Sequence, residues 1–376
     1  LSNLNQFSPI STDFQLRPSP NFSQNLTLRD LSNSLTQLQE YQIRGIRQNG
    51  VIYQRVKDLN ETSKQQLRDL EYFDKVEEVN QSVRENSLTT NAIIEYTLTS
   101  LIKNNPEEQT AKKEIETVCR GLGYQVNDGG LNRYSQDVVL SSSSNQHRVN
   151  EAIAHICRDW HSDFDVERKP LREYILSRLK KLPKKDTLVV VPGAGVGNMA
   201  YEIAKVNPHS RVDSVELSTL MYLCNEFVLG HNSSVTIRPY AQHYSCQLTA
   251  KDQMRKLTLD LSDFSKPANL NVHLGDFCKY QPTEQYDQIV VCSVFFVDTA
   301  ENIFDYFEAI EELKGYTKEL HWINVGPLKY GTRPLVQFTA EELAKLRRLR
   351  GWKDIHCQDD VKNLNGYLTN KSSLYQ

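Results

Sequence analysis

The stretch VVVPGAGVGNMA, residues 189–200, changes character halfway along its length. Its branched apolar residues are typical of a buried strand, and the apolar spacing that follows the glycines is typical of a helix. A glycine-rich turn between a strand and a helix lets a ligand approach the backbone beside a helix N-terminus. The alternative is a tight turn with no ligand. The neighbouring sequence helps to decide between the two.

After Pro183 the sequence alternates between strand and helix patterns. Such alternation predicts a parallel sheet with helices on both faces, in an α/β fold. A long stretch of mixed character, residues 231–268, interrupts the alternation. The strand patterns cover 187–193, 211–217, 269–277, 286–296 and 320–327, and the helical patterns cover 198–206, 220–230 and 300–314.

Three parts are expected along the chain. Residues 1–30 are rich in Asn, Ser, Gln and Pro and have few apolar residues, so we expect a flexible segment. Residues 31–180 follow helical spacing and predict an all-helical N-terminal domain. Residues 181–376 form the α/β domain, and we expect the chain to end before the last strand of its sheet.

Composition excludes several classes of function. The net charge is −3, so no basic excess indicates a nucleic-acid partner. The seven cysteines show no metal-ligand spacing, and we expect reduced thiols and no metal site. No apolar run has membrane-spanning length. We expect a cytoplasmic, and also nuclear, protein with no membrane partner; the oligomeric state stays open.

The glycine spacing separates two nucleotide cofactors. The dinucleotide fingerprint G-x-G-x-x-G requires a third glycine at position 198, where this chain has Asn198. Gly193, Gly195 and Gly197 instead follow G-x-G-x-G, the spacing usual in methyltransferases that use S-adenosylmethionine (SAM). An NAD-type oxidoreductase is therefore the weaker alternative.

The ends of the following strands fit the same cofactor. Glu216 ends the second strand, where a carboxylate can accept both ribose hydroxyls. Asp276 ends the third strand, where methyltransferases have an acidic residue for the adenine amino group, and Phe277 provides an apolar neighbour for the ring. The fourth strand ends at CSVFFVDT, where substrate and methyl donor meet. These features predict a Rossmann-like, SAM-dependent methyltransferase sheet.

Residues 149–376 resemble the carnosine N-methyltransferases. The motifs that carry the resemblance are CRDW (157–160), VPGAGVGNMAYEIA, GDF, FFVDTAENIFDYFEAI and WINVGPLKY. The resemblance implies methyl transfer from SAM to a ring nitrogen of a histidine-containing dipeptide, with carnosine converted to anserine. The partner would then be a small-molecule imidazole dipeptide.

The resemblance also implies a set of site residues. Asp298 is the expected catalytic residue, because it follows the fourth strand where the accepting nitrogen is held. A family histidine after the G-P-L-x-Y segment is replaced here by Gly331. The cofactor residues are His155, Arg158, Gly193, Gly195, Glu216, Asp276, Phe277, Cys292 and Ser293, and the substrate residues are Phe295, Asp298, Tyr330 and Tyr367.

Several alternatives stay open from the residues alone. Asp298 could cap a helix that begins near Thr299, and Phe295 and Phe296 could be core residues. Arg158 could be a surface residue on a helix. At the level of function, the alternatives are methylation of a protein or peptide histidine or of another small imidazole compound, and a non-catalytic SAM-binding protein.

Overall fold

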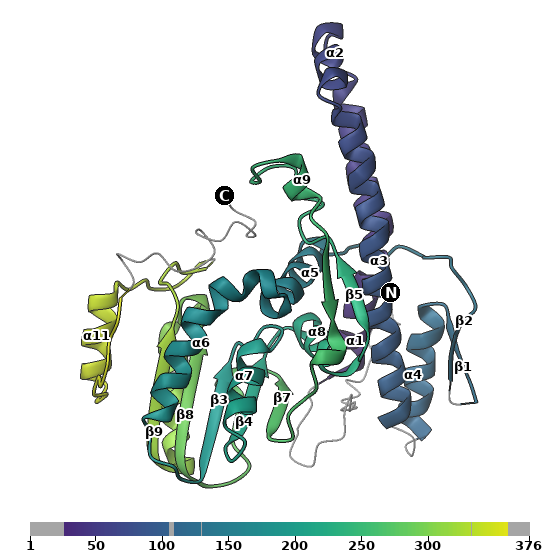
Figure 1. Ribbon diagram of the computed structural model, residues 1–376. Coiled ribbons are helices and arrows are strands. Elements are labelled where there is room, and N and C mark those ends of the chain that lie inside the picture. Colours follow the sequence, from purple (N-terminus) through teal and green to yellow (C-terminus); the bar gives the residue numbers. More distant parts are fainter. Residues whose placement is uncertain (1–25, 105–108, 129, 332, 360–376) are drawn as a thin grey trace, which may run out of the picture. The chain divides into compact units, whose positions relative to one another are not determined.

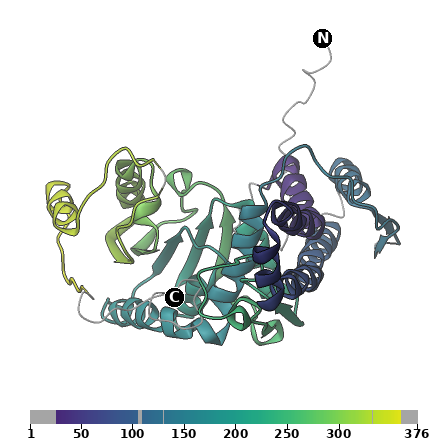
Figure 2. The same ribbon diagram turned by 90° about the horizontal axis from the view of Figure 1, so that it is seen from above.

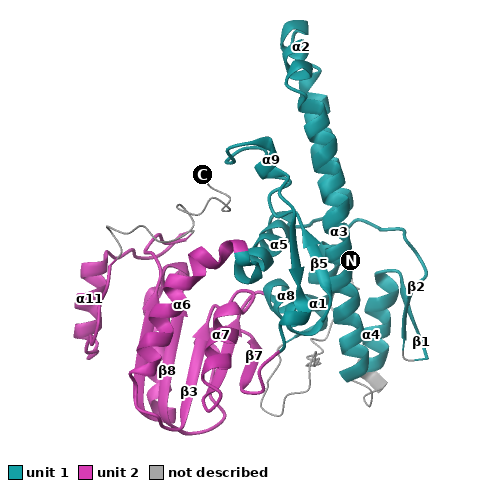
Figure 3. Ribbon diagram, in the orientation of Figure 1, with its two compact units in different colours: residues 1–162, 219–265, 374–376 teal, residues 163–218, 266–373 magenta. Residues whose placement is uncertain are grey.

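The computed structural model describes residues 26–104, 109–128, 130–331 and 333–359. It divides into two compact units, coloured separately in Figure 3. Unit 1 comprises Leu1–Ser162, Thr219–Ser265 and Leu374–Gln376, and unit 2 comprises Asp163–Ser218 and Lys266–Ser373.

Unit 2 contains a parallel sheet with the strand order β7-β4-β3-β8-β9. The central strand β3 is buried at every residue, which explains why its sequence is a continuous apolar run and does not alternate. The predicted α/β fold is confirmed by this sheet. Its strands are β3 (Thr187–Pro192), β4 (Arg211–Glu216), β7 (Leu270–Leu274), β8 (Tyr286–Val294) and β9 (Thr317–Val325).

Helices of unit 2 cover both faces of the sheet. The connections β3→β4 and β8→β9 run in opposite directions across the sheet, so right-handed crossovers place α7 and α10 on opposite faces. Figure 1 shows α6 and α7 in front of the sheet, and Figure 2 shows α10 on its other side. The carboxyl ends of β3 and β8 therefore flank the switch point of the fold, where α/β proteins bind ligands. The helices are α6 (Asp165–Lys180), α7 (Asn198–Val206), α10 (Ile303–Glu312) and α11 (Ala340–Leu349).

Unit 1 is mainly helical. α1 and α3 pack along each other, and α2 lies at the far end of the pair (Figure 1). α8 is buried along almost its whole length and packs against α1, α3 and α5. The elements are α1 (Leu28–Val56), α2 (Glu61–Asp69), α3 (Tyr72–Asn104), α4 (Gln109–Gly121), α5 (Gln146–Trp160), α8 (Thr219–Gly230), β5 (Ser234–Ile237), α9 (Ala250–Gln253) and β6 (Leu257–Asp260).

The prediction of an all-helical N-terminal domain is wrong in one place. β1 (Tyr124–Asn127) and β2 (Gly130–Arg133) form an antiparallel hairpin. Asp128, in the turn, has a φ of 52°, a conformation that Asp tolerates better than most residues. The hairpin falls where the sequence LGYQVNDGG interrupts the helical spacing, and Asn, Asp and Gly residues in a sequence favour a turn over a helix.

The compact units do not coincide with the expected division at residue 180/181. α6 packs on α7 and β9 and belongs to unit 2. Thr219–Ser265, which includes α8, belongs to unit 1. Among the described residues, no helix is long and apolar enough to cross a membrane, and no group of His, Cys, Asp or Glu side chains could hold a metal ion.

Candidate functional site

The turn after β3 depends on glycine. Gly193, Gly195 and Gly197 have φ values of 58°, 60° and 88°, in the left-handed region that only glycine enters without strain. A Cβ atom on Gly193 would also lie 2.5 Å from Cδ2 of Phe296. Gly197 is the N-cap residue of α7. The turn therefore brings bare backbone to the carboxyl end of β3, next to the residues that follow β8.

The Glu216 carboxylate joins this turn to the end of β4. Its Oε2 accepts a hydrogen bond of 2.7 Å from the Gly195 amide, and its Oε1 accepts one of 3.2 Å from the Ser218 amide. A carboxylate oxygen can accept more than one hydrogen bond. The side chain that the sequence assigns to ribose is thus fixed beside the glycine turn.

Asp276 and Phe277 lie at the end of the next strand. The Gly275 amide donates to the Glu216 carbonyl at 2.9 Å, which holds the ends of β4 and β7 together. Asp276 Oδ1 accepts from the Cys278 amide at 2.9 Å and caps the short 3-10 turn η3 (Phe277–Lys279). Asp276 is exposed, whereas Phe277 is buried. The structure thus brings Glu216, Asp276 and Phe277 to one edge of the sheet, together with the glycine turn.

The two phenylalanines after β8 have different environments. Phe296 is buried and stacks on Tyr306, with ring centroids 4.2 Å apart and an angle of 4° between the planes. Its ring also meets Phe277 edge to face at 5.8 Å. Phe295 is 41% exposed and has a φ of 49°. Such strain in a large side chain is found at functional sites. Phe296 therefore forms part of the core, as one alternative expected, and Phe295 faces solvent.

Cys292 and Ser293 lie inside the sheet. Both are fully buried, and burial raises the pKa of the Cys292 thiol. The Ser293 hydroxyl donates to Asn324 Oδ1 at 2.6 Å and accepts from Trp322 Nε1 at 2.9 Å. Because the single hydroxyl proton is used, this side chain connects β8 to β9. The cofactor contact predicted for these two residues stays a prediction.

Asp298 is buried in the 3-10 turn η4 (Val297–Thr299). Its Oδ2 accepts from the Lys329 amide at 3.0 Å. The helix-cap alternative does not hold, because α10 begins at Ile303 and its cap is Asn302, whose Oδ1 accepts from the Phe304 amide at 3.1 Å. Within the described ranges no donor is found for Asp298 Oδ1. One carboxylate oxygen is thus fixed by backbone and the other has acceptor capacity left.

Tyr330 stabilises the loop that follows β9. Its hydroxyl donates to the Phe338 carbonyl at 3.0 Å and accepts from the Phe338 amide at 2.8 Å. Burial raises the pKa of this phenol. The hydroxyl proton is therefore used within the loop, and the predicted contact of Tyr330 with a substrate stays a prediction. Gly331, the next residue, donates its amide to the Asp298 carbonyl at 2.9 Å. Tyr367 lies outside the described residues.

His155 and Arg158 belong to unit 1, where both lie on α5. His155 Nε2 is 3.7 Å from Glu151 Oε1, one helical turn away, and this contact lowers the pKa of Glu151. The other cofactor residues described above belong to unit 2. The predicted contact of His155 and Arg158 with the cofactor therefore stays a prediction.

Two neighbours of the site were not anticipated from the sequence. Tyr306 supports Phe296, and its hydroxyl lies 3.2 Å from Thr299 Oγ1 beside Asp298. Asn324 fixes Ser293 across β8 and β9. Helical spacing could have placed Tyr306 on the inner face of α10, but neither contact has a signal in a short motif.

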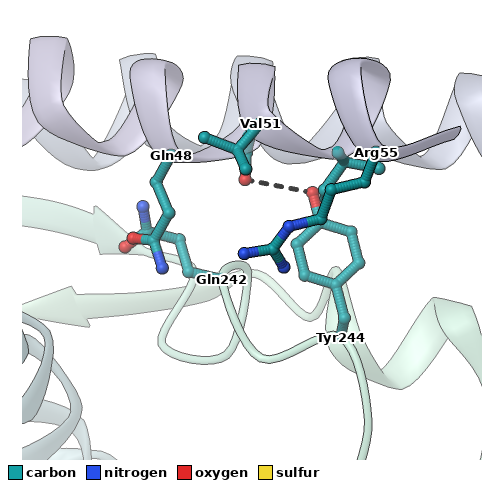
Figure 4. Close-up of a pocket in the computed structure, with 7 residues that line it drawn as sticks. Gln48, Val51, Arg55, Gln242 and Tyr244 are labelled. Carbon is teal, nitrogen blue, oxygen red and sulfur yellow. Dashed lines mark hydrogen bonds between the residues drawn. The ribbon is translucent and has the colours of Figure 1, made fainter. Parts of the chain in front are cut away.

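A separate cavity of about 290 Å³ lies in unit 1. Figure 4 shows it between one face of α1 and the loop after β5, where the Tyr244 hydroxyl donates to Asn49 Oδ1 at 3.1 Å. None of the residues predicted for the cofactor or substrate lines it. The lining residues are Gln48, Asn49, Val51, Ile52, Arg55, Gln242 and Tyr244.

Comparison with known proteins gives a consistent set of relatives. A family model described as carnosine N-methyltransferase matches residues 135–376. An uncharacterized protein of Saccharomyces cerevisiae is 47% identical, over 93% of this chain and 79% of its own length. The carnosine N-methyltransferases of Schizosaccharomyces pombe and Rattus norvegicus are each 29% identical, over 52% and 55% of this chain.

The chain spans 59% of the S. pombe protein and 54% of the rat protein. Among solved structures, a glycopeptide N-methyltransferase complexed with SAM is similar at 12% identity and a TM-score of 0.25, over 39% of this chain and 46% of that chain.

Proposed function

Because the chain belongs to the carnosine N-methyltransferase family, we propose that it methylates an imidazole nitrogen of a histidine-containing dipeptide and converts carnosine to anserine. The chain is a methyltransferase, and its methyl donor is SAM. The observation that carries the proposal is the edge of the sheet described above. There, Glu216 ends β4 and Asp276 lies two residues after the end of the neighbouring β7, and the Gly275 amide links the two segments beside the glycine turn.

The residues present at this edge fit SAM. Gly193 is exposed, so a ligand can approach its backbone. Each carboxylate oxygen of Glu216 can accept more than one hydrogen bond, as two ribose hydroxyls require. Asp276 is exposed next to Phe277, as an adenine amino group and ring require. Asn198, in the first turn of α7, has a buried Oδ1 atom that lacks a hydrogen-bond partner in the described part of the chain.

These residues would hold the cofactor, and SAM when bound supplies a methyl group that its sulfonium already activates. The protein must then orient the acceptor and exclude water. Glu216 would hold the ribose hydroxyls, Asp276 and Phe277 the adenine, and Gly193 and Gly195 would allow the backbone to approach closely.

Asp298 would orient the acceptor. A neutral imidazole has one N–H group and one lone-pair nitrogen. Oδ1 of Asp298, held in place through the Lys329 bond to Oδ2, can accept the N–H and so direct the lone pair of the other nitrogen toward the methyl group. The same carboxylate would stabilise the positive charge that develops on the ring. Asp298 is 9% exposed, which strengthens this electrostatic interaction because little water screens it.

A second candidate is methylation of a histidine in a protein or peptide, or of another small imidazole compound. The observation that favours it is Gly331, which stands where the family commonly has a histidine that contacts the dipeptide. The donor side and Asp298 would serve either acceptor in the same way.

The test is transfer of labelled methyl groups from SAM to a panel of acceptors. The panel contains carnosine, other imidazole dipeptides, free histidine and histidine-containing proteins. We expect carnosine to be methylated on a ring nitrogen, with anserine as the product. Labelling of proteins with no labelling of the dipeptides would replace the first candidate by the second.

A further inference from the structure

A buried group of polar side chains lies under the turn that carries Asp276 and Phe277. It consists of Asp213 on β4, His273 on β7, Tyr280 after η3 and Arg211 at the start of β4. Asp213 is 4% exposed. Burial of a carboxylate is unfavourable unless it is hydrogen-bonded and paired with positive charge, so the group needs an explanation. The proposed function uses none of these residues.

Asp213 is the centre of the group. The Tyr280 hydroxyl donates a hydrogen bond to its Oδ2. His273 Nε2 lies 3.5 Å from the same oxygen. On the other side, Asn271 Nδ2 donates to Oδ1 at 3.2 Å, and Arg211 Nε lies 3.5 Å from Oδ1. Both carboxylate oxygens are therefore held by partners.

The pKa shifts of Asp213 and Tyr280 show which of the two groups carries the proton in their hydrogen bond. Burial would raise the pKa of Asp213, but the contact with His273, the hydrogen bond from Tyr280 and the charge of Arg211 outweigh burial, and the pKa is lowered. Burial and the Asp213 charge together raise the pKa of Tyr280. Tyr280 is therefore the donor and Asp213 the charged acceptor, which is the stronger kind of hydrogen bond.

Tyr280 connects this group to the cofactor edge. Its ring stacks with that of Phe277, with centroids 6.3 Å apart and an angle of 18° between the planes. Its amide donates to the Phe277 carbonyl at 3.0 Å and ends η3. A turn as short as η3 has few bonds of its own, so a ring fixed behind Phe277 restricts the conformations of the turn.

We propose that Tyr280 and Asp213 are positioning residues for cofactor binding. The hydrogen bond between them holds the Tyr280 ring behind Phe277, and so keeps Asp276 and Phe277 in the arrangement that receives the adenine. The inference rests on the proposed function. A turn ordered before binding does not have to be ordered by the ligand, which raises affinity.

The test compares tyrosine-to-phenylalanine variants of the full chain. Tyr280→Phe keeps the ring and removes the hydroxyl. The matched control is Tyr286→Phe: Tyr286 lies on β8 in the same core, burial raises its pKa to about 12, and its hydroxyl has no hydrogen-bond partner in the described part of the chain. Calorimetry measures the Kd of S-adenosylhomocysteine and of 5′-methylthioadenosine, which share the adenine, and kinetics measures KM and kcat.

For Tyr280→Phe we expect both Kd values, and the KM for SAM, to rise by about tenfold, the effect of a lost hydrogen bond to a charged group. We expect kcat at saturating SAM and the KM for the acceptor to stay unchanged. Asp213→Asn should weaken binding in the same direction, and the double variant should add little, because one bond is removed. Tyr286→Phe should change none of these values.

A lower Tm for Tyr280→Phe with unchanged Kd values would overturn the inference, because the bond would then be only structural. Equal losses in Tyr280→Phe and Tyr286→Phe would also overturn it. If Tyr280→Phe does not fold, Asp213→Asn, which keeps the shape of the acceptor, decides by the same measurements. If the wild-type chain binds no S-adenosylhomocysteine, both the proposed function and this inference are wrong. If the wild type binds it and the variants have the same Kd values, only the inference is wrong.

Discussion

At Asp298 the backbone holds one carboxylate oxygen, which leaves the second for a substrate. Asp298→Asn keeps the shape of the side chain and removes the charge that would face the developing imidazolium. We expect the rate of methyl transfer to carnosine to fall by about a hundredfold or more, because the lost stabilisation acts in a site with little water. SAM affinity and Tm should change little. Single-turnover kinetics with labelled SAM, together with calorimetry, would measure these effects.

The control for Asp298 is the residue that does cap α10. Asn302→Ala removes a cap at a half-buried helix start and should lower the free energy of unfolding by about 1 kcal/mol. Its turnover per folded molecule should equal that of the wild type. Near-normal turnover in Asp298→Asn would mean that the substrate is oriented by another residue, and the ring of Tyr330 would be tested next.

Glu216 is expected to act on the donor side alone. Glu216→Ala removes the acceptor for ribose and also releases the Gly195 amide, so SAM binding should weaken by about 2 kcal/mol or more. Glu216→Gln keeps one acceptor oxygen and should lose less. Calorimetry with S-adenosylhomocysteine measures both losses. An unchanged Kd in Glu216→Ala would remove the cofactor site from this edge of the sheet.

The sequence could predict the place of residues that lie at or just after the ends of predicted strands. Glu216 and Asp276 are examples, because parallel strands end at one edge of the sheet. It could not predict the role of a side chain where that role depends on packing between elements. The Tyr330 hydroxyl bonds to Phe338, and Phe296 stacks on Tyr306 of α10, and no local motif encodes either contact.

Among the elements, the turn between β3 and α7 is the most sensitive to substitution. Gly193→Ala would place a Cβ atom 2.5 Å from Phe296 Cδ2, on a residue whose φ is 58°. We expect the free energy of unfolding to fall by about 2 kcal/mol or more, from the left-handed backbone and the displaced ring together. SAM binding should weaken as well. Denaturant unfolding and calorimetry would measure the two effects.

Gly315→Ala is the matched control for this turn. Gly315 lies in η5 (Leu313–Tyr316), and a Cβ atom there would meet no heavy atom within 4 Å. Its stability should be equal to that of the wild type or higher, because alanine restricts the unfolded chain. If Gly193→Ala behaved like Gly315→Ala, the close approach of backbone and ring at Gly193 would have no energetic consequence.

The elements differ in how well their sequence predicts them. β3 is buried on both faces, so its run of branched apolar residues is distinct. β1 and β2 have four residues each and are mostly not buried, so the alternation of more and less exposed residues along them is too short to mark a strand. The Asn, Asp and Gly residues between them favour a turn but do not by themselves predict a hairpin.

On the scale of the whole molecule, the part of the chain that the structure describes passes between the two units three times, at residues 162/163, 218/219 and 265/266. The sequence predicted one domain boundary near residue 180, because strand and helix patterns alternate regularly after this residue. The spacing of apolar residues shows which face of a helix is buried, but it does not show which element covers that face. α8 follows the alternation, yet in unit 1 it packs against α1, α3 and α5.

A chain shortened to residues 183–376 tests this organisation. It lacks α1, α3 and α5, so the apolar residues of α8 that these helices bury in unit 1 would become exposed. It also lacks α6, whose Ile175 is fully buried in unit 2. Exposed apolar surface of this extent favours association and incomplete folding. We expect the shortened chain to aggregate in size-exclusion chromatography, to unfold without a cooperative transition and to bind S-adenosylhomocysteine weakly.

The matched shortening begins at Asn25 and retains Leu26, which is fully buried, and Thr27, which caps α1. It removes only residues for which composition predicts flexibility, and so it should keep the Tm and the affinity of the full chain. The comparison separates loss of length from loss of the helices that cover α8. A monomeric 183–376 fragment with the affinity of the full chain would show that the methyltransferase sheet and its cofactor site form without the N-terminal helices. His155 and Arg158 would then have no part in binding the donor.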